Sequence, residues 1–298
     1  TYAYSLGGGT ALFIVFSIVI VAGAFLAFVV RIVKLKIRHL TRYRYASPLR
    51  AAVQTLCLTP SSGAGQQVHH WCLDVSGRLQ PHTDAWGNRS HLMHIEAGER
   101  DLRCEASGVV ETCGQAWSPE PAGPDPRVYL APSPLAVLDA AMRHDLRDAG
   151  LEAPRDEDLA LALARHVAER VRYRAGTTHA GTTAAQAWQG GEGVCQDQAH
   201  AFVAACRGLG VPARYVSGYF HAPGSESLAS HAWAEICPDP AARRWLGIDI
   251  THVGRVDERH VRLAVGPDYA ACSPIRGVRS GGGRERLTVE LEIVALPA

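Results

Sequence analysis

The chain has 298 residues, of which 47% are hydrophobic; this is enough to bury a large core, and the length suggests about two domains. Its 30 basic and 29 acidic residues leave a formal net charge of +1, so no global charge imbalance favours nucleic acid as a partner. The eight cysteines are too dilute for a disulfide scaffold and form no CxxC pair typical of structural zinc. We expect mostly reduced thiols, although bridges Cys57–Cys72 or Cys104–Cys113 would suit an oxidising compartment.

An apolar stretch from Ala11 to Val30 is long enough to span a bilayer, and basic residues follow it at once. Residues 1–34 are therefore a candidate transmembrane anchor. Basic residues stay on the cytoplasmic side, so the rest of the chain would be cytoplasmic. The alternative is that this segment does not belong to the functional unit.

Residues 35–116 alternate apolar and polar side chains in short runs, which predicts half-buried strands of an antiparallel β-sandwich. The expected strands are Leu35–Leu40, Ala51–Thr59, Gln67–Val75, Ser90–Glu96 and Leu102–Thr112. Four histidines in this region fit alternating strand faces better than a metal site; they are His69, His70, His91 and His94. A proline-rich stretch then breaks the periodicity, so we expect a linker at residues 117–132.

Residues 133–298 are expected to form a second domain that contains helices and strands. Helical periodicity covers Pro134–Ala149 and a second helix that begins near Asp156. A Thr- and Gly-rich loop at residues 176–183 leads into residues 184–189, and this loop could either shape a substrate entrance or serve as a linker. Further on, apolar runs predict strands at Ala213–Phe220, His231–Cys237 and Arg244–Asp249.

The stretch Gly193-Val194-Cys195-Gln196-Asp197-Gln198-Ala199-His200 places a cysteine where a loop becomes a helix. Ala199, Phe202 and Cys206 continue as the buried stripe of that helix. Unpaired N–H groups and the helix dipole at the first turn favour a thiolate, which suits Cys195 as a nucleophile. The alternative is a buried structural cysteine.

Two further residues can complete a catalytic site around Cys195. His231 opens one predicted strand and Asp249 ends the next, so a hairpin between them would bring the two side chains level. A thiolate needs a base to move its proton, and the base needs a group that fixes its tautomer. Cysteine, histidine and aspartate fill these roles.

These motifs resemble the bacterial transglutaminase-like family. The resemblance rests on the Cys195 stretch, Val211-Pro212-Ala213-Arg214-Tyr215, Ser230-His231-Ala232-Trp233 and Gly247-Ile248-Asp249, and residues 35–112 are similar to the family's amino-terminal β domain. It implies an α+β fold: an antiparallel β domain followed by a papain-like transglutaminase core with a Cys195-His231-Asp249 triad. Two departures are Ile250, where the family has proline, and Gln198, where an aromatic residue is common.

The resemblance implies thiol-dependent acyl transfer on peptide or glutamine amide bonds of a peptide or protein substrate. We expect hydrolysis; transfer to an amine, or a binding module without catalysis, are the alternatives. The supporting residues are expected to be Asp197, His200, Tyr219 and Trp233, with Tyr219 lining the cleft. We expect no cofactor and no metal, because a site built from Cys195, His200 and His231 lacks typical zinc spacing.

Overall fold

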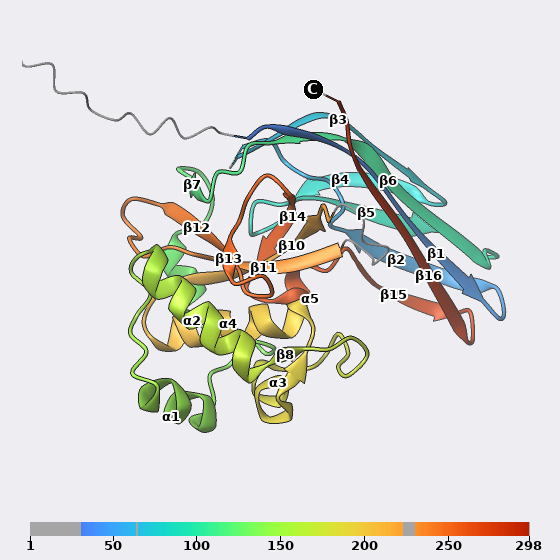
Figure 1. Ribbon diagram of the computed structural model, residues 1–298. Coiled ribbons are helices and arrows are strands. Elements are labelled where there is room, and N and C mark those ends of the chain that lie inside the picture. The colour runs from blue at the N-terminus through green and yellow to red at the C-terminus, as the bar shows by residue number, and fades with distance from the viewer. Residues whose placement is uncertain (1–30, 64, 223–229, 298) are drawn as a thin grey trace, which may run out of the picture.

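The computed structural model describes residues 31–63, 65–222 and 230–297. In this part of the chain, two stacked β-sheets form a sandwich and a third sheet is covered by helices, which gives an α+β fold (Figure 1). The candidate anchor at residues 11–30 lies outside the described residues. Among those described, no helix is long and apolar enough to cross a membrane. The anchor therefore stays a prediction.

The first sheet of the sandwich is antiparallel throughout, in the order β16-β1-β6-β3. Its strands are β1 (Val33–Tyr45), β3 (Gln66–Val75), β6 (Asp101–Thr112) and β16 (Glu285–Ala295). Leu35 and Ile37 of β1 are buried, whereas Lys34 and Lys36 are exposed. This alternation is what the sequence predicts for a strand with one face on a core.

The second sheet has the order β15-β2-β5-β4 and is also antiparallel. Its strands are β2 (Leu49–Leu56), β4 (Arg78–Thr83), β5 (Arg89–Ile95) and β15 (Ile275–Gly281). Leu56 and Met93 of this sheet meet Ala106 and Val110 of the first sheet in a common core. Strand β4 was not expected, because Arg78-Leu79-Gln80-Pro81-His82 has little apolar alternation.

The carboxy-terminal strands differ from the expected division of the chain. Residues 133–298 were assigned to the second domain as a whole, but β16 pairs with β1, and β15 pairs with β2. For example, Leu35 lies opposite Ala295, and Leu56 opposite Ile275. The sandwich is therefore built from both ends of the described chain, and the core domain is inserted between them.

The third sheet has the order β13-β12-β11-β10-β14, and β7 pairs with the first half of β12. Its strands are β7 (Trp117–Pro119), β10 (Ala213–Phe220), β11 (Ser230–Ile236), β12 (Arg244–Asp249), β13 (Gly254–Arg255) and β14 (His260–Gly266). Strands β10 and β12 have the predicted bounds. Strand β7 lies in the stretch predicted as a linker, so part of residues 117–132 belongs to the core sheet.

Helices cover one side of this third sheet (Figure 1). They are η1 (Pro126–Leu130), α1 (Ala140–Asp148), α2 (Glu157–Arg170), α3 (Ala184–Gly190), α4 (Cys195–Gly208) and α5 (Tyr269–Cys272), and a short parallel pair, β8 (Arg172–Tyr173) and β9 (Glu192–Gly193), lies beside them. Helix α1 begins later than expected because Asp139 caps it, accepting a hydrogen bond from the Met142 N–H at 2.8 Å. Helix α4 is the central one: residues 199–206 are buried against β10 and β11.

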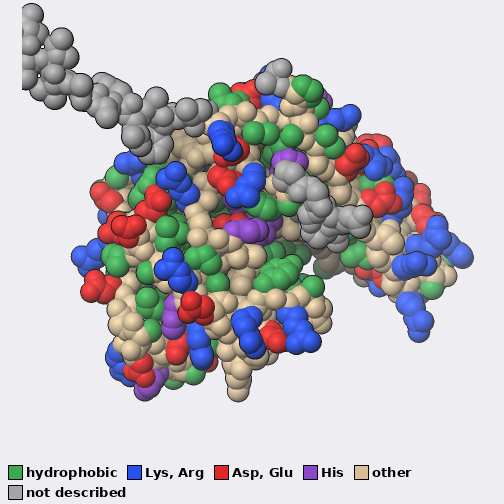
Figure 2. Space-filling view, in the orientation of Figure 1, with side chains coloured by type: hydrophobic (Ala, Val, Ile, Leu, Met, Phe, Trp, Pro, Cys, Tyr) green, Lys and Arg blue, Asp and Glu red, His purple; other side chains and the backbone are tan. Residues whose placement is uncertain are grey.

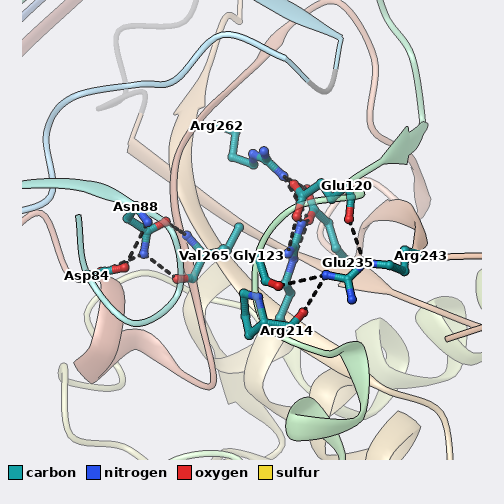
Figure 3. Close-up of polar contacts among 10 residues, drawn as sticks. Asp84, Asn88, Glu120, Gly123, Arg214, Glu235, Arg243, Arg262 and Val265 are labelled. Carbon is teal, nitrogen blue, oxygen red and sulfur yellow. Dashed lines mark hydrogen bonds and ion pairs between the residues drawn. The ribbon is translucent and has the colours of Figure 1, made fainter. Parts of the chain in front are cut away.

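A buried ion-pair cluster fastens the segment after β7 to the third sheet (Figure 3). Arg214 is 2% exposed at its side chain; its Nε lies 2.7 Å from Glu235 Oε2 and its Nη1 2.8 Å from Glu120 Oε2. Arg262 Nη1 also reaches Glu120, at 2.5 Å. Burial alone would raise the pKa of Glu120, but Arg262 and Arg214 outweigh it and lower the pKa to about 2.

A second polar link joins the sandwich to the third sheet. The Asn88 side chain donates to the Val265 carbonyl at 2.7 Å and accepts from the Val265 N–H at 2.8 Å (Figure 3). Asp84 holds that amide in place at 2.9 Å. The turn between β4 and β5 therefore behaves like an extra strand partner for β14.

All eight cysteines are free. The Cys57 thiol contacts Ser90 Oγ at 3.5 Å, and the Cys113 thiol donates to the Gly65 carbonyl at 3.2 Å. The bridges considered for Cys57 and Cys113 are thus not formed in this structure.

Candidate active site

Cys195 is the first residue of α4, as the sequence predicts, and Val194 is the N-cap. The turn before it requires glycine, because a Cβ on Gly193 would lie 2.7 Å from Asp197 Cβ. Asp197 closes the turn: its Oδ2 accepts from the Val194 N–H at 2.8 Å and from the Thr178 hydroxyl at 2.6 Å. The thiol is thereby held at the positive end of the helix, and its side chain is partly exposed.

His231 and Asp249 are brought together by the predicted hairpin of β11 and β12. The strands pair antiparallel, with Ala234 opposite Ile248, so the start of β11 lies beside the end of β12. His231 Nε2 is 2.9 Å from Asp249 Oδ2. Burial of the His231 ring lowers its pKa, but hydrogen bonds with Asp249 and Cys195 outweigh burial, so the net shift is upward. Nε2 thus pairs with the Asp249 carboxylate, so Nδ1 is the nitrogen that can interact with the Cys195 thiol.

Two more imidazoles form hydrogen bonds with Asp249 Oδ2. His252 Nδ1 lies 2.7 Å from it and His260 Nε2 lies 3.0 Å from it. The carboxylate is 1% exposed, and burial would raise its pKa. The hydrogen bonds from His231, His252 and His260 dominate and hold the pKa well below the usual range, so Asp249 is a fixed negative charge.

His260 is clamped between two carboxylates. Its Nε2 faces Asp249, its Nδ1 lies 2.9 Å from Asp257 Oδ1, and its side chain is 1% exposed. Burial lowers the pKa of His260, but the two carboxylates outweigh burial and raise it. Arg259 in turn binds Asp257 through Nε at 2.9 Å. On its buried side, the Asp249 carboxylate is therefore held by a chain of paired groups that runs through His260 and Asp257 to Arg259.

Phe220, the last residue of β10, forms an aromatic wall beside the imidazoles. Its ring centroid lies 5.3 Å from that of His231, 4.9 Å from His260 and 4.5 Å from His252, on which it stacks at 25°. Figure 2 shows histidine side chains near the middle of one face, beside a recess between the helical part and the sandwich.

The four residues expected to support the triad have different surroundings. Asp197 shapes the turn of Cys195. His200 is fully buried; its Nε2 accepts from the Tyr269 N–H at 3.1 Å, and burial lowers its pKa to about 4, so the ring is neutral. Trp233 is buried between the triad and the ion-pair cluster, with its ring 5.2 Å from His260 at 78°.

Tyr219 does not line the cleft. Its side chain is 1% exposed and packs in the core of the sandwich. Its hydroxyl bonds His39 Nδ1 at 2.9 Å. The physical reason is strand alternation: Tyr219 and Phe220 are neighbours on β10 and point to opposite faces, so Phe220 is the residue beside the triad.

Sequence reasoning missed Phe220, His252 and His260. His252 follows Asp249 by one turn, where its N–H also bonds Asp249 Oδ1 at 3.2 Å, and an Asp-x-x-His spacing after a strand could have indicated this. His260 opens β14, and only the fold brings it to Asp249.

The metal site considered from the sequence is not assembled either. His200 Nε2 accepts from the Tyr269 N–H, and His200 belongs to no group of three metal-ligating side chains found among the described residues. The side chains that do gather in suitable positions are His231, Asp249 and His252, whose ligand atoms lie within 4.8 Å of one another.

Residues 147–250 match the transglutaminase-like superfamily, and residues 35–111 match the bacterial transglutaminase-like N-terminal region. The chain thus contains a bacterial transglutaminase-like N-terminal region followed by a transglutaminase-like core, which confirms the resemblance.

Its curated relatives include uncharacterized mycobacterial proteins. One from Mycobacterium leprae is 28% identical over 287 residues, which cover 88% of this chain and 99% of that protein. One from Mycobacterium tuberculosis is 29% identical over 272 residues, covering 82% and 86%. A solved structure from Cytophaga hutchinsonii, called a "putative cysteine protease", has a TM-score of 0.71 at 20% identity and covers 90% of this chain and 92% of its own. This last likeness shows that the fold is shared.

Proposed function

We propose that the protein is a cysteine hydrolase that cleaves a peptide or side-chain amide bond through Cys195, His231 and Asp249. One observation carries this proposal: His231 Nε2 lies 2.9 Å from Asp249, a buried and ionised carboxylate, and Asp249 and Cys195 together raise the pKa of the His231 ring. This order of groups is the one that nucleophilic thiol catalysis requires.

In the proposed reaction, the Cys195 thiolate attacks the amide carbonyl while His231 carries the proton. The carbonyl carbon gains the Cys195 Sγ bond, and the amide C–N bond breaks as His231 Nδ1 protonates the leaving amine. Water, deprotonated by the now neutral His231, then releases the acid and restores the thiolate. Asp249 keeps the imidazole oriented throughout.

The oxyanion formed in the attack needs hydrogen-bond donors. The first N–H groups of a helix have no partner within the helix, and Cys195 begins α4. Its own backbone N–H is therefore the donor we assign to the oxyanion. The partly exposed thiol is open to water, which favours hydrolysis as the outcome.

The test is thiol labelling followed by turnover. Iodoacetamide is reacted with wild type, Cys195→Ala and His231→Ala between pH 5 and 9, and adducts are read by intact mass. We expect one thiol to label rapidly below pH 7, to disappear in Cys195→Ala and to react about tenfold or more slowly in His231→Ala. Buried Cys206 serves as the internal control, because burial raises its pKa and keeps it unreactive.

A peptide library with and without added lysine then separates hydrolysis from transamidation. Release of the free acid in both conditions supports hydrolysis. Products that contain lysine would instead show that the acyl group is transferred to an amine. If Cys195 labels no faster than an ordinary thiol, the chain is a binding module and the catalytic proposal fails.

A further inference from the structure

Three metal-ligating atoms meet at the outer edge of the triad: His231 Nε2, Asp249 Oδ2 and His252 Nδ1. The side chains of His231 and Asp249 are 8% and 1% exposed, whereas that of His252 is 44% exposed. The group is thus buried on one side and open to solvent on the other. Two imidazoles and a carboxylate are a donor set that Zn²⁺ and neighbouring transition metals favour.

We propose that these three atoms form a binding site for a divalent transition metal ion of the Zn²⁺ class, and that the bound ion inhibits the enzyme. The inhibitory part of this inference rests on the proposed function, whereas the binding part does not.

The spacing of the three atoms supports a site that needs little rearrangement. Asp249 Oδ2 lies 2.9 Å from His231 Nε2 and 2.7 Å from His252 Nδ1. Ligands held about 2.1 Å from a tetrahedral ion lie about 3.4 Å from one another. The His231–Asp249 pair must therefore open by about 0.5 Å and the His252–Asp249 pair by about 0.7 Å. The exposed His252 ring can make this movement, and water can complete the coordination.

The surroundings already orient the ligands as outer contacts do in metal sites. His260 donates to Asp249 from the buried side at 3.0 Å, so the carboxylate stays fixed when the other two imidazoles leave it for an ion. The His252 N–H bonds Asp249 Oδ1, and the Phe220 ring stacks on the His252 ring at 4.5 Å. The ionised carboxylate supplies the negative charge that the cation needs.

Metal binding blocks the proton transfers by His231 on which the proposed catalysis depends. The ion bonds His231 Nε2 and displaces that proton to solvent, and it bonds His252 Nδ1, so that the bound His252 ring carries its proton on Nε2. His231 then keeps one proton, on Nδ1. Giving it to the leaving amine would leave a metal-bound imidazolate, which makes the ring a poor acid. The acyl-enzyme would therefore form slowly or not at all.

Calorimetry with ZnCl₂ tests the site without any need for activity. The full chain carrying Cys195→Ser is stripped with EDTA and titrated at pH 7.5, since this substitution removes the thiolate as a competing zinc ligand. The same titration is made with Cys195→Ser/His252→Asn. Asparagine can still donate a hydrogen bond to Asp249 but replaces the imidazole ligand. Cys195→Ser/His144→Asn is the matched control, because His144 is an exposed histidine on α1 that pairs with Asp148.

We expect one saturable Zn²⁺ site in Cys195→Ser and in the His144 control, weakened about 100-fold or more in the His252 variant. Thermal unfolding of the three metal-free proteins checks that each is folded. Equal affinity with and without the His252 imidazole, or the absence of a saturable site in Cys195→Ser, overturns the proposal. Because the readout is heat and the background is inactive, failure here leaves the proposed hydrolase function untouched, and failure of the hydrolase assay leaves this measurement valid.

Discussion

Two buried charge networks lie on the same face of strand β11, one around His231 and the other around Glu235. Each is built on carboxylates whose pKa is held low, Asp249 in the first and Glu120 in the second. In the second network the partners are arginines, which do not give up a proton in proteins. In the first they are histidines, which exchange protons near neutral pH. The cation, and not the buried carboxylate, therefore decides whether such a cluster can transfer protons.

The two networks also differ in how they meet solvent. Arg214 is enclosed, with its guanidinium 3.9 Å from the Trp245 ring centroid, and the side chain of its partner Glu120 is 23% exposed. The Asp249 network opens to solvent at His252. The Glu120 network therefore fixes the segment after β7 to the sheet, whereas the Asp249 network is the active site that we propose.

The largest expected effect comes from Asp249→Asn. Hydrolysis should fall about 10⁴-fold, because an amide cannot hold His231 in the working tautomer or stabilise its charge. Steady-state turnover measures this, with Cys195→Ala as the inactive reference and urea unfolding as the check on folding. Activity within tenfold of wild type would place Asp249 with the purely structural carboxylates.

Next comes Arg214→Met, which leaves Glu120 and Glu235 without their shared cation. The free energy of unfolding should drop by about 3–5 kcal/mol, as expected when one member of a buried ion pair is removed. Urea unfolding measures the loss, and adding Glu235→Gln in the same chain should recover part of it. The labelling rate of Cys195 should stay unchanged; a changed rate would show that the two networks are coupled.

A smaller loss is expected when wild type is acidified. Glu120 has its pKa lowered from 4.5 to about 2, so the unfolded chain binds its proton first. The stability it contributes is present above pH 4.5 and is lost as the pH falls toward 2. Asp249 acts in the same direction. Unfolding free energy measured from pH 5 to 2 should therefore fall less steeply in Glu120→Gln, and an unchanged slope contradicts this assignment.

The smallest effect is expected at the buried pair of His39 and Tyr219. Burial lowers the pKa of His39 to about 4, so its bond with Tyr219 joins two uncharged groups. Tyr219→Phe should cost about 1 kcal/mol of stability. Hydrolysis should be unaffected. A tenfold loss of turnover would instead return Tyr219 to the substrate cleft.

Local patterns were enough to predict the helix that begins at Cys195 and the hairpin that pairs β11 with β12. Both depend on contacts between near neighbours in sequence. His260 and the strands β15 and β16 could not be placed this way, because their partners lie far away along the chain. Gly218 lies opposite His231 in the pairing of β10 with β11. Because side chains alternate along a strand, Phe220 shares the His231 side of the sheet and Tyr219 points to the other side. The alternation of β10 alone, without its pairing, does not give this.

The pairing of β1 with β16 bears on how the chain folds as it is made. During synthesis β1 emerges long before β16, so one of its edges stays unpaired while the whole inserted domain is being translated. Loop closure over such a distance is slow, and open strand edges invite association with other chains. We therefore expect the inserted domain to fold first and the sandwich to close last, with ribosome release or a chaperone setting the pace.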